Sequence, residues 1–495
     1  MKPPLPNLSR RSFIKGASLT ACGIATSGCS GLFGKSEVRF AVVGMRIRGM
    51  QLIRQFLSQG KDESEPWDIP PVRLVAICDV DSEILAQRAR EIEEITTEKV
   101  ETYDDYQVLL QQKHIDAVVI ATPNHWHALQ TIWACEAGKD VYVEKPVCHS
   151  VWEGRQMVIA ARRHKRIVQS GTQNRSDLGL LAAFPRLLAG DLGPIRHVHG
   201  LCFRDRKSIG KQEAPLTPPP SVNYDQWLGP AEDLPMYRPR FHYDWHWFWN
   251  TGNGDIGNQG PHEMDLIRWV LGDPDHPQEV FSFGGRFAWD DAGETPNMQV
   301  ASFKMNNIPV TFEVRNLTVD AETNAAPSYK GTRVGVVVTC EGGQFRGGRG
   351  GGFFYDNDGK RMQAFPGDGG GDHMAGFFRA VASRRRSELK SPVREGYMSS
   401  CLGHLGNISY RLGETVGDDT LRSSIADDPW LSAAHERHLE QLKAWNLDPS
   451  QLQWTHGQAL QFDAASEQFH GEAANRANPL LRREGRAPYT IPSYV

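Results

Sequence analysis

The chain lacks any run of apolar residues near the twenty or so that a membrane-spanning helix needs, so we expect no membrane span in the mature protein. It also lacks a large excess of either charge, because 23% of its residues are charged and the net charge is −4. This balance is not typical of a protein that binds a polyanion, and we expect no nucleic-acid partner. Internal repeats are absent, and the 495 residues are enough for about two or three domains.

Cysteine is scarce and scattered. The chain has eight cysteines, and no two of them form a C-x-x-C pair, which argues against a zinc site or a disulfide framework. Most of them are expected to be small buried residues, namely Cys78, Cys135, Cys148, Cys202, Cys340 and Cys401. The other two, Cys22 and Cys29, each end a short pattern typical of lipoprotein processing, so a lipid anchor at one of them remains open.

The N-terminus carries a pattern typical of an export signal. Ser9-Arg10-Arg11-Ser12-Phe13-Ile14-Lys15 precedes a mildly apolar run of small residues that reaches Gly28. Twin arginines before such a run predict recognition by the twin-arginine export machinery, which carries folded proteins. We therefore expect residues 1–34 to be an export signal and linker, and the protein to be periplasmic or otherwise exported.

Strand-like and helix-like stretches alternate between Val38 and Gly171. Alternation of this kind predicts a parallel sheet with right-handed crossovers, and hence an α/β fold with a doubly wound Rossmann domain over residues 35–170. Apolar runs typical of strands are Val38–Val43, Val72–Cys78, Ile115–Ala121, Val141–Val143 and Ile167–Gln169.

Two segments of this region indicate a dinucleotide site. The first strand leads into Gly44-Met-Arg46-Ile-Arg-Gly49, a turn that offers backbone N–H groups and the positive end of a helix to a pyrophosphate. Arg46 stands where the usual fingerprint has its middle glycine. Asp79 ends the second strand, where a carboxylate binds a ribose and repels a 2'-phosphate, so NAD is favoured over NADP.

The rest of the chain has a different pattern. Residues 171–413 are expected to form a second, α+β domain with an open, mainly antiparallel sheet, and residues 414–495 a helical C-terminal extension. Aromatic and cationic residues concentrate between Phe203 and Trp249, as in the rim of a polar-ligand pocket. The glycine clusters 347–352 and 367–371 are expected to form mobile surface loops.

Two motifs in this order resemble the glucose-fructose oxidoreductase and inositol dehydrogenase family, Gfo/Idh/MocA. They are Glu144-Lys145-Pro146 after a Rossmann strand and the stretch Gly254 to Asp265, which reads GDIGNQGPHEMD. Thr122-Pro-Asn-His-Trp-His127 also resembles the family's loop near the nicotinamide. With the double-arginine leader, the stretches GTQNR, FHYDWHW and HLGNISY resemble an exported subgroup. The resemblance implies carbohydrate or polyol substrates, and we expect a homo-oligomer.

The resemblance assigns catalytic and cofactor residues. Lys145 would bond the substrate hydroxyl and move its proton, if burial lowers the pKa of its ammonium. His262 matches the family's histidine, while Asn258 stands where the family has an aspartate. The cofactor-binding set is then Gly44, Arg46, Gly49, Asp79, Thr122, Asn124, His127, Glu144 and Lys145.

Substrate contacts are expected from loops around the same pocket. The residues placed there are Gln173, Arg175, Arg206, Tyr243, Trp245 and His262. Arg206 is equally interpretable as part of a solvated face, and Trp245 as a packing residue. Asp265 is either a substrate contact or an anchor inside its domain. His242 and His246 have i, i+4 spacing but no third ligand, so we expect no metal site.

Three functions fit these residues. The leading one is an NAD-dependent oxidoreductase that moves a hydride between nicotinamide and a sugar, polyol or glycoside carbon. The second is an NAD-dependent glycosidase that uses transient oxidation and elimination, although the sequence lacks the Tyr-rich histidine motif of known redox hydrolases. The third is a nonenzymatic sugar-binding protein, which Arg46 and Asn258 favour. A protein that is exported in folded form would have to capture its NAD in the cytoplasm, so we expect the NAD to be tightly bound.

Overall fold

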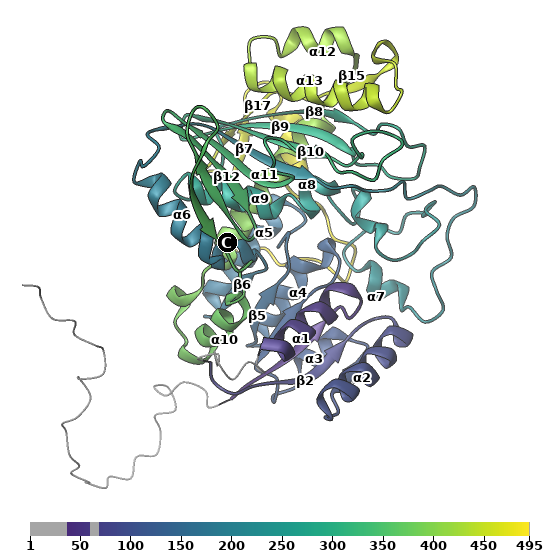
Figure 1. Ribbon diagram of the computed structural model, residues 1–495. Helices are drawn as coiled ribbons and strands as arrows, with labels where there is room; N and C mark the ends of the chain where they lie inside the picture. Colours follow the sequence, from purple (N-terminus) through teal and green to yellow (C-terminus); the bar gives the residue numbers. More distant parts are fainter. Residues whose placement is uncertain (1–36, 60–68, 495) are drawn as a thin grey trace, which may run out of the picture. The chain divides into compact units, whose positions relative to one another are not determined.

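The computed structural model describes residues 37–59 and 69–494 (Figure 1). The predicted export signal and both candidate lipid-attachment cysteines, Cys22 and Cys29, lie outside these residues. Within the described ranges, no helix combines the length and the apolar character that a membrane span needs. The described part of the chain contains two β-sheets, and the six cysteines in it are free and buried.

The first sheet is parallel throughout and has the strand order β3-β2-β1-β4-β5-β6. This is the doubly wound order of a Rossmann domain, as the alternation of strands and helices predicted. Its strands are β1 Val38–Val43, β2 Val72–Cys78, β3 Glu101–Tyr103, β4 Ala117–Ile120, β5 Asp140–Val143 and β6 Val168–Ser170. Its helices are α1 Ile47–Gln59, α2 Ser82–Thr96, α3 Tyr106–Leu110, α4 Asn124–Glu136 and α5 Val151–Arg163.

Local chemistry explains where these elements begin. The central strands β4 and β5 are buried along their whole length, which is typical of parallel strands covered on both faces. Side chains of Asp81, Asp105 and Ser150 accept N–H groups from the first turns of α2, α3 and α5. Such N-caps satisfy backbone donors that a helix leaves free at its start.

The second sheet has twelve strands and is open. Every pair is antiparallel except β7 with β10, so the predicted mainly antiparallel sheet is confirmed. Its first strands are β7 Ile195–Phe203, β8 Glu279–Gly285, β9 Met298–Met305, β10 Ile308–Arg315, β11 Val334–Cys340, β12 Gly343–Gly348, β13 Gly351–Tyr355 and β14 Arg361–Pro366. The helices in this part are α6 Leu178–Leu188, α7 Tyr224–Leu228, α8 Gly254–Asn258, α9 Pro261–Val270, α10 His373–Ser383 and α11 Val393–Arg411.

The C-terminal segment is not only helical, as the sequence led us to expect, but also adds strands to the second sheet. β15 Glu414–Gly417 pairs with β16 Gln453–His456, and β16 pairs with β8. β17 Leu460–Asp463 also pairs with β8 and with β18 Gln468–His470. The helices between and after them are α12 Asp418–Ser424, α13 Pro429–Ala444 and α14 Ala474–Ala477.

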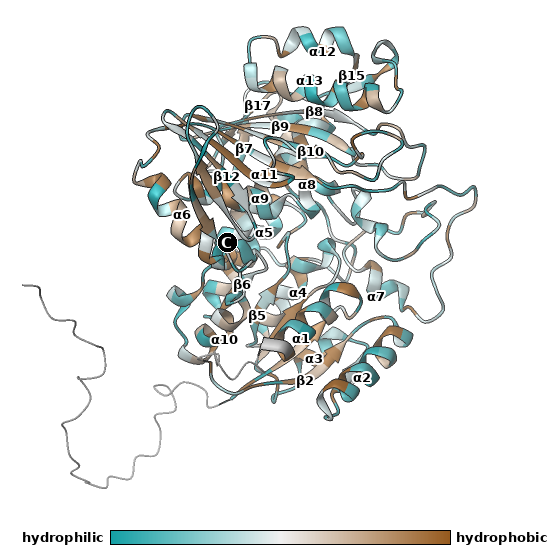
Figure 2. Ribbon diagram, in the orientation of Figure 1, coloured by the Kyte–Doolittle hydropathy of each residue, from teal (hydrophilic) through white to brown (hydrophobic). Residues whose placement is uncertain are grey.

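Both faces of the second sheet are covered near β9. Ala301 and Phe303 belong to the core that α9 and α11 complete, while Val300 belongs to a cluster with Leu431 and Leu439 of α13. Neighbouring residues of a strand point to opposite faces, so α13 lies on the face away from α9 and α11. Figure 1 shows α12 and α13 beside β8 and β9, and Figure 2 shows hydrophobic residues along strands of both sheets, such as β2 and β7.

The first of the two glycine clusters differs from the loop that the sequence predicted, whereas residues 367–371 do form a loop. Residues 347–352 form the ends of β12 and β13 and the turn between them, paired strand to strand. A Cβ on Gly347 would lie 2.4 Å from the carbonyl oxygen of Gly351, so the close pairing needs glycine there. Gly350 and Gly369 both donate their backbone N–H to Asp177 Oδ2, at 3.0 and 2.7 Å. The second cluster is therefore tied to the first through one carboxylate.

Candidate active site

A cavity of about 470 Å³ lies at the carboxyl ends of the parallel strands. Residues that directly follow β1, β2 and β5 line it, namely Gly44, Asp79 and Glu144 with Lys145. An open, doubly wound sheet binds its ligand at this edge. The structure therefore brings the glycine turn and the Glu-Lys-Pro motif, a hundred residues apart in the sequence, to one cavity.

The start of α1 forms one wall of the cavity. Gly44 has φ +87°, and Arg46, Ile47 and Arg48 line the cavity beside it. The first turn of α1 has no acidic residue, which leaves the positive helix end available to an anion. Gly49 does not line the cavity; a Cβ there would lie 2.1 Å from the Gly44 carbonyl oxygen, so Gly49 serves the tight turn into the helix.

Asp79 joins the second strand to this turn. Its Oδ2 accepts the N–H of Met45 at 2.6 Å, and its Oδ1 accepts the N–H of Asp81 at 3.0 Å. Burial raises the pKa of Asp79 despite these hydrogen bonds and the nearby Arg46. The carboxyl group therefore lies where the sequence predicted it, and it also fixes the shape of the glycine turn.

Glu144 is a buried carboxylate held by cations. Burial alone would raise the pKa of Glu144, but the charges of Arg48 and Lys145 outweigh it and keep that pKa below its ordinary value. Arg48 Nε donates to Glu144 Oε1 at 2.7 Å, and Gln173 Nε2 donates to the same oxygen at 3.3 Å. Glu144 is therefore ionised and oriented by Arg48, a residue for which the sequence motif gave no role.

Lys145 is a half-buried cation of the site. Its Nζ donates to the backbone oxygen of Asn258 at 2.6 Å. Burial lowers the pKa of Lys145, Glu144 opposes this effect and Arg48 adds to it, so the pKa lies below its ordinary value. An ammonium with a lowered pKa can give up its proton closer to neutral pH.

The side chain of Asn258 contacts Asp255 and not His262. Asn258 Nδ2 donates to Asp255 Oδ1 at 3.1 Å. Arg206 Nε and Nη2 each donate to Asp255 at 2.8 Å, and Asn316 Nδ2 donates at 2.6 Å. The charge and hydrogen bonds of Arg206 overcome the effect of burial and depress the pKa of Asp255. Arg206 thus supports the cavity wall from behind and is not among the lining residues.

His262 lines the cavity as a neutral ring. Burial, followed by the charges of Lys145 and Arg48, lowers its pKa well below the ordinary value. Its Nδ1 is buried and has no hydrogen-bond partner among the described residues. A neutral imidazole with a free nitrogen can form a hydrogen bond to a bound hydroxyl, but it carries no charge near neutral pH.

The loop after β4 supplies further lining residues. Thr122, Asn124 and His127 all line the cavity. The His127 ring nitrogens lie 2.6 Å from the Pro146 oxygen and 2.7 Å from the Thr122 oxygen, so the ring braces the loop after β4 against the loop after β5. Thr122 Oγ1 in turn donates to Gln130 Oε1 at 2.7 Å.

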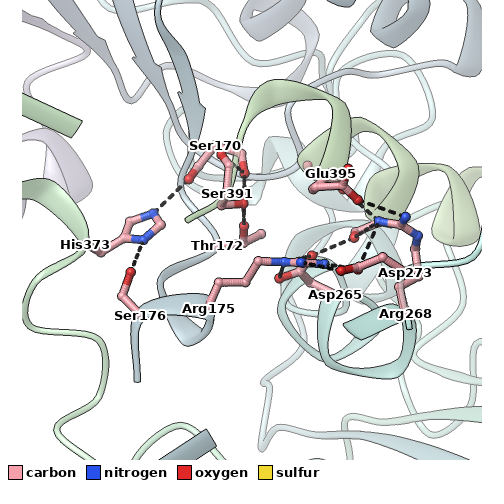
Figure 3. Close-up of polar contacts among 12 residues, drawn as sticks. Ser170, Thr172, Arg175, Ser176, Asp265, Arg268, Asp273, His373, Ser391 and Glu395 are labelled. Atoms are coloured by element: carbon pink, nitrogen blue, oxygen red, sulfur yellow. Dashed lines mark hydrogen bonds and ion pairs between the residues drawn. The ribbon is translucent and has the colours of Figure 1, made fainter. Parts of the chain in front are cut away.

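The predicted substrate residues divide into two groups. Gln173, Tyr243 and Trp245 line the cavity, and Tyr243 has φ +73°, a strained conformation for a residue with a side chain. Arg175 does not line the cavity. Its guanidinium forms ion pairs with Asp265 at 2.9 Å and with Asp273 at 2.6 Å, as Figure 3 shows.

The same network accounts for Asp265. Ser399 Oγ donates to Asp265 Oδ1 at 2.8 Å, so this carboxyl group has partners within the protein on two sides.

His242 Nε2 lies 3.2 Å from Asp81 Oδ2, and His246 Nδ1 lies 2.8 Å from the Tyr243 oxygen. Across residues 37–59 and 69–494, no three or more His, Cys, Asp or Glu side chains are grouped to hold a metal ion.

Several lining residues carried no sequence signal. They come from segments far from the motifs, namely Arg349, Pro488 and Tyr489. Gln226 and Trp227 lie inside the segment Phe203 to Trp249, which the sequence placed at the rim of a pocket. Arg48 was also missed, although it lies inside the glycine segment Gly44 to Gly49. The first three depend on chain segments that only the folded structure brings to the cavity.

The parallel sheet and its cavity define a dinucleotide-binding class of protein. Residues 38–172 match the model of the "oxidoreductase family, NAD-binding Rossmann fold", and residues 195–290 match that family's "C-terminal alpha/beta domain". These two regions match models of the Gfo/Idh/MocA oxidoreductase family, in agreement with the resemblance of the motifs.

Relatives and solved structures agree with this family. A glycosyl hydrolase family 109 protein of Shewanella pealeana is 31% identical over 226 residues, which cover 41% of this chain and 49% of the relative. The chain spans about half the length of the curated relatives it matches.

The similar solved structures share the fold. The WlbA dehydrogenase of Bordetella pertussis, in complex with NADH and UDP-GlcNAcA, has a TM-score of 0.52 and 20% identity, covering 74% of this chain and 94% of that one. The aldose-aldose oxidoreductase of Caulobacter crescentus, complexed with glycerol, has a TM-score of 0.53 and 14% identity, covering 75% and 97%.

Proposed function

We propose that this protein is an NAD-dependent enzyme that oxidises a hydroxyl-bearing carbon of a sugar, polyol or glycoside, or reduces the corresponding carbonyl. The observation that carries the proposal is Lys145, a half-buried lysine directly after the carboxyl end of β5, whose pKa desolvation lowers below its ordinary value. It lines the cavity together with Glu144 and His262.

The residues of the cavity fit a nicotinamide dinucleotide. The start of α1 and Arg46 suit a pyrophosphate, Asp79 suits a ribose, and the cavity continues from there to Lys145. Asp79 favours NAD over NADP because its negative charge repels a 2'-phosphate. Arg46 beside it is the feature that favours NADP, so identification of the bound nucleotide decides between them.

A bound nicotinamide would supply a hydride acceptor or donor. In the oxidising direction, neutral Lys145 accepts the proton of the substrate hydroxyl through its Nζ. His262, whose ring lines the cavity, holds the same hydroxyl or a neighbouring one. Glu144 stays ionised and keeps Lys145 in place, while Tyr243 and Trp245 present a phenol and an indole to the sugar.

A glycosidase is the second candidate because the curated relatives are described as glycosyl hydrolases of family 109. Such an enzyme would oxidise a sugar carbon transiently, eliminate the aglycone and then reverse the oxidation. The same half-buried lysine and neutral histidine would serve its proton transfers. The nonenzymatic alternative is less favoured, since a half-buried lysine with a lowered pKa is not needed for sugar binding alone.

Bound nucleotide and product together test the proposal. We expect protein purified from export-competent cells to release NAD on denaturation, as measured by mass spectrometry. Sugars with added NAD should then give net NADH if the protein is a dehydrogenase, whereas p-nitrophenyl glycosides without added NAD should give p-nitrophenol if it is a glycosidase. A protein that neither carries nor binds a nicotinamide nucleotide would rule out both.

We also propose that the protein is exported by the twin-arginine machinery, with a lipid anchor at Cys22 or Cys29 left open, and that it forms a homo-oligomer. The arginine pair Arg10-Arg11 motivates the export proposal. Retention of an Arg10→Lys, Arg11→Lys variant in the cytoplasm would support it, and unchanged export would exclude it. Light scattering of the purified protein would settle the oligomeric state.

A further inference from the structure

The last residues of the chain lie along one end of the cavity. Pro488 and Tyr489 line it together with Trp126 and Trp133 of α4. The Tyr489 ring centroid lies 5.4 Å from that of Trp126 and 6.4 Å from that of Trp133. In Figure 1 the yellow C-terminal segment passes beside α4 and α5.

This end of the cavity is the one farthest from Lys145 along the sheet. Lys145 follows β5, whereas Asp105 and Gln107, which line this end, follow β3 at the opposite edge. A dinucleotide with its reactive ring at Lys145 and its ribose at Asp79 would place its base here. The flat faces of two indoles and a phenol suit a planar base.

The C-terminal segment is fastened across the cavity to α7. Arg486 Nη1 donates to Asp225 Oδ1 at 2.7 Å, and its Nη2 donates to the Asp225 backbone oxygen at 2.9 Å. The Tyr489 hydroxyl donates to Asp225 Oδ2 at 2.8 Å. The neighbours of Asp225, Gln226 and Trp227, line the cavity themselves, so this attachment joins the two walls of that end.

Both ends of the segment are also anchored to the Rossmann helices. Arg483 donates to Glu153 Oε1 of α5 at 2.7 Å and to the His125 backbone oxygen of α4 at 2.8 Å. The Tyr494 N–H donates to Gln156 Oε1 of α5 at 2.7 Å, and its hydroxyl donates to Glu136 of α4. Residues 483–494 therefore form a strap that is held before, at and after the cavity.

We propose that this C-terminal strap is part of the cofactor site and keeps the nucleotide bound through many turnovers. The inference rests on the proposed function and goes beyond it. A nucleotide beneath Tyr489 leaves only after the bonds of Arg486 and Tyr489 to Asp225 break. A resident cofactor that is reduced by one substrate must be reoxidised in the same site by a bound product or a second substrate. The strap thus favours reactions in which the bound cofactor is reduced and then reoxidised in the same site over reactions that release NADH.

The release rate of bound nucleotide tests the strap. The variant carries Arg486→Ala and Tyr489→Ala, and the matched control is Arg482→Ala, whose guanidinium lies over Trp152 outside the cavity. We expect the double variant to release nucleotide at least about tenfold faster than the parent after dilution, as followed by chromatography and mass spectrometry. The control should release it at the parent rate.

The possible results distinguish a failure of the strap proposal from a failure of the proposed function. A parent protein that holds nucleotide and a double variant that releases it no faster would overturn the strap alone. A parent protein that neither holds nor binds NAD or NADP would overturn the proposed function and the strap together. If the double variant does not fold, Tyr489→Leu alone gives the same comparison, because it keeps the bonds of Arg486 and removes only the phenol.

Discussion

Replacing Lys145 with Met is expected to lower turnover by roughly a thousandfold while the protein stays folded and keeps its nucleotide. Methionine preserves much of the volume of the lysine stem but offers no proton donor or acceptor. The steady-state rate at saturating substrate measures the loss. In the parent, oxidation should rise with pH through the pKa of Lys145, which lies below its ordinary value because desolvation disfavours the ammonium. That pH-dependent rise should be missing in the variant.

Lys139→Met is the matched control for this prediction. Lys139 is a buried lysine that flanks the same strand, β5, at its opposite end. Its Nζ donates to the backbone oxygens of Gln112 and Ile115, at 2.6 and 2.9 Å. Its loss should cost stability but leave turnover per folded molecule unchanged. Substantial residual turnover in Lys145→Met, with the same pH profile as the parent, would remove Lys145 from the chemistry.

Replacing Arg175 with Met is expected to destabilise the protein by about 3–5 kcal/mol. The side chains of Arg175 and Asp265 are 6% and 0% exposed, so loss of the guanidinium leaves a buried carboxyl group without its cation. The shift of the urea unfolding midpoint measures the effect. KM for the sugar should change little, because Arg175 is held by Asp265 and Asp273 and does not line the cavity.

A second substitution checks the cause of this loss. Arg175→Met combined with Asp265→Asn removes both charges and should recover part of the stability, since the uncompensated buried charge is gone. Ser399 can still bond the amide. Unchanged stability in Arg175→Met, together with a large rise in KM, would return Arg175 to the substrate-binding role that its position after β6 suggested.

The sequence predicted the Rossmann half of the fold well because each element there has a local signature. The buried runs of β1 and β2 match the predicted bounds. β3, with only Glu101–Tyr103, has no apolar run, because it lies at the edge of the sheet and none of its residues is buried. The short strand was therefore missed.

The second sheet was harder to predict. β12 and β13 are rich in glycine, which leaves no alternation of apolar and polar side chains, and only backbone pairing defines them. Strands β15 to β18 pair within the C-terminal segment, and β16 and β17 also pair with β8, about 170 to 180 residues earlier in the chain. Local patterns carry no information about such long-range pairing.

The residues of the candidate site were likewise predictable from the sequence only in part. Residues inside contiguous motifs, such as Glu144, Lys145 and His262, were predicted and do line the cavity. Arg175 shows the limit of that reasoning, because its position after a strand was right for the cavity, yet Asp265 and Asp273 direct its guanidinium elsewhere. Tyr489 lies more than two hundred residues from the nearest of these motifs, and only the strap brings it to them.

An experimental structure of the protein with its nucleotide bound is the most direct test of the central claim. The account predicts the nicotinamide ring in contact with Lys145 and the base beneath Tyr489, with the pyrophosphate at the start of α1. A nucleotide whose ring lies away from Lys145, or side chains that fill the crevice beside β1 and leave no room for one, would contradict it.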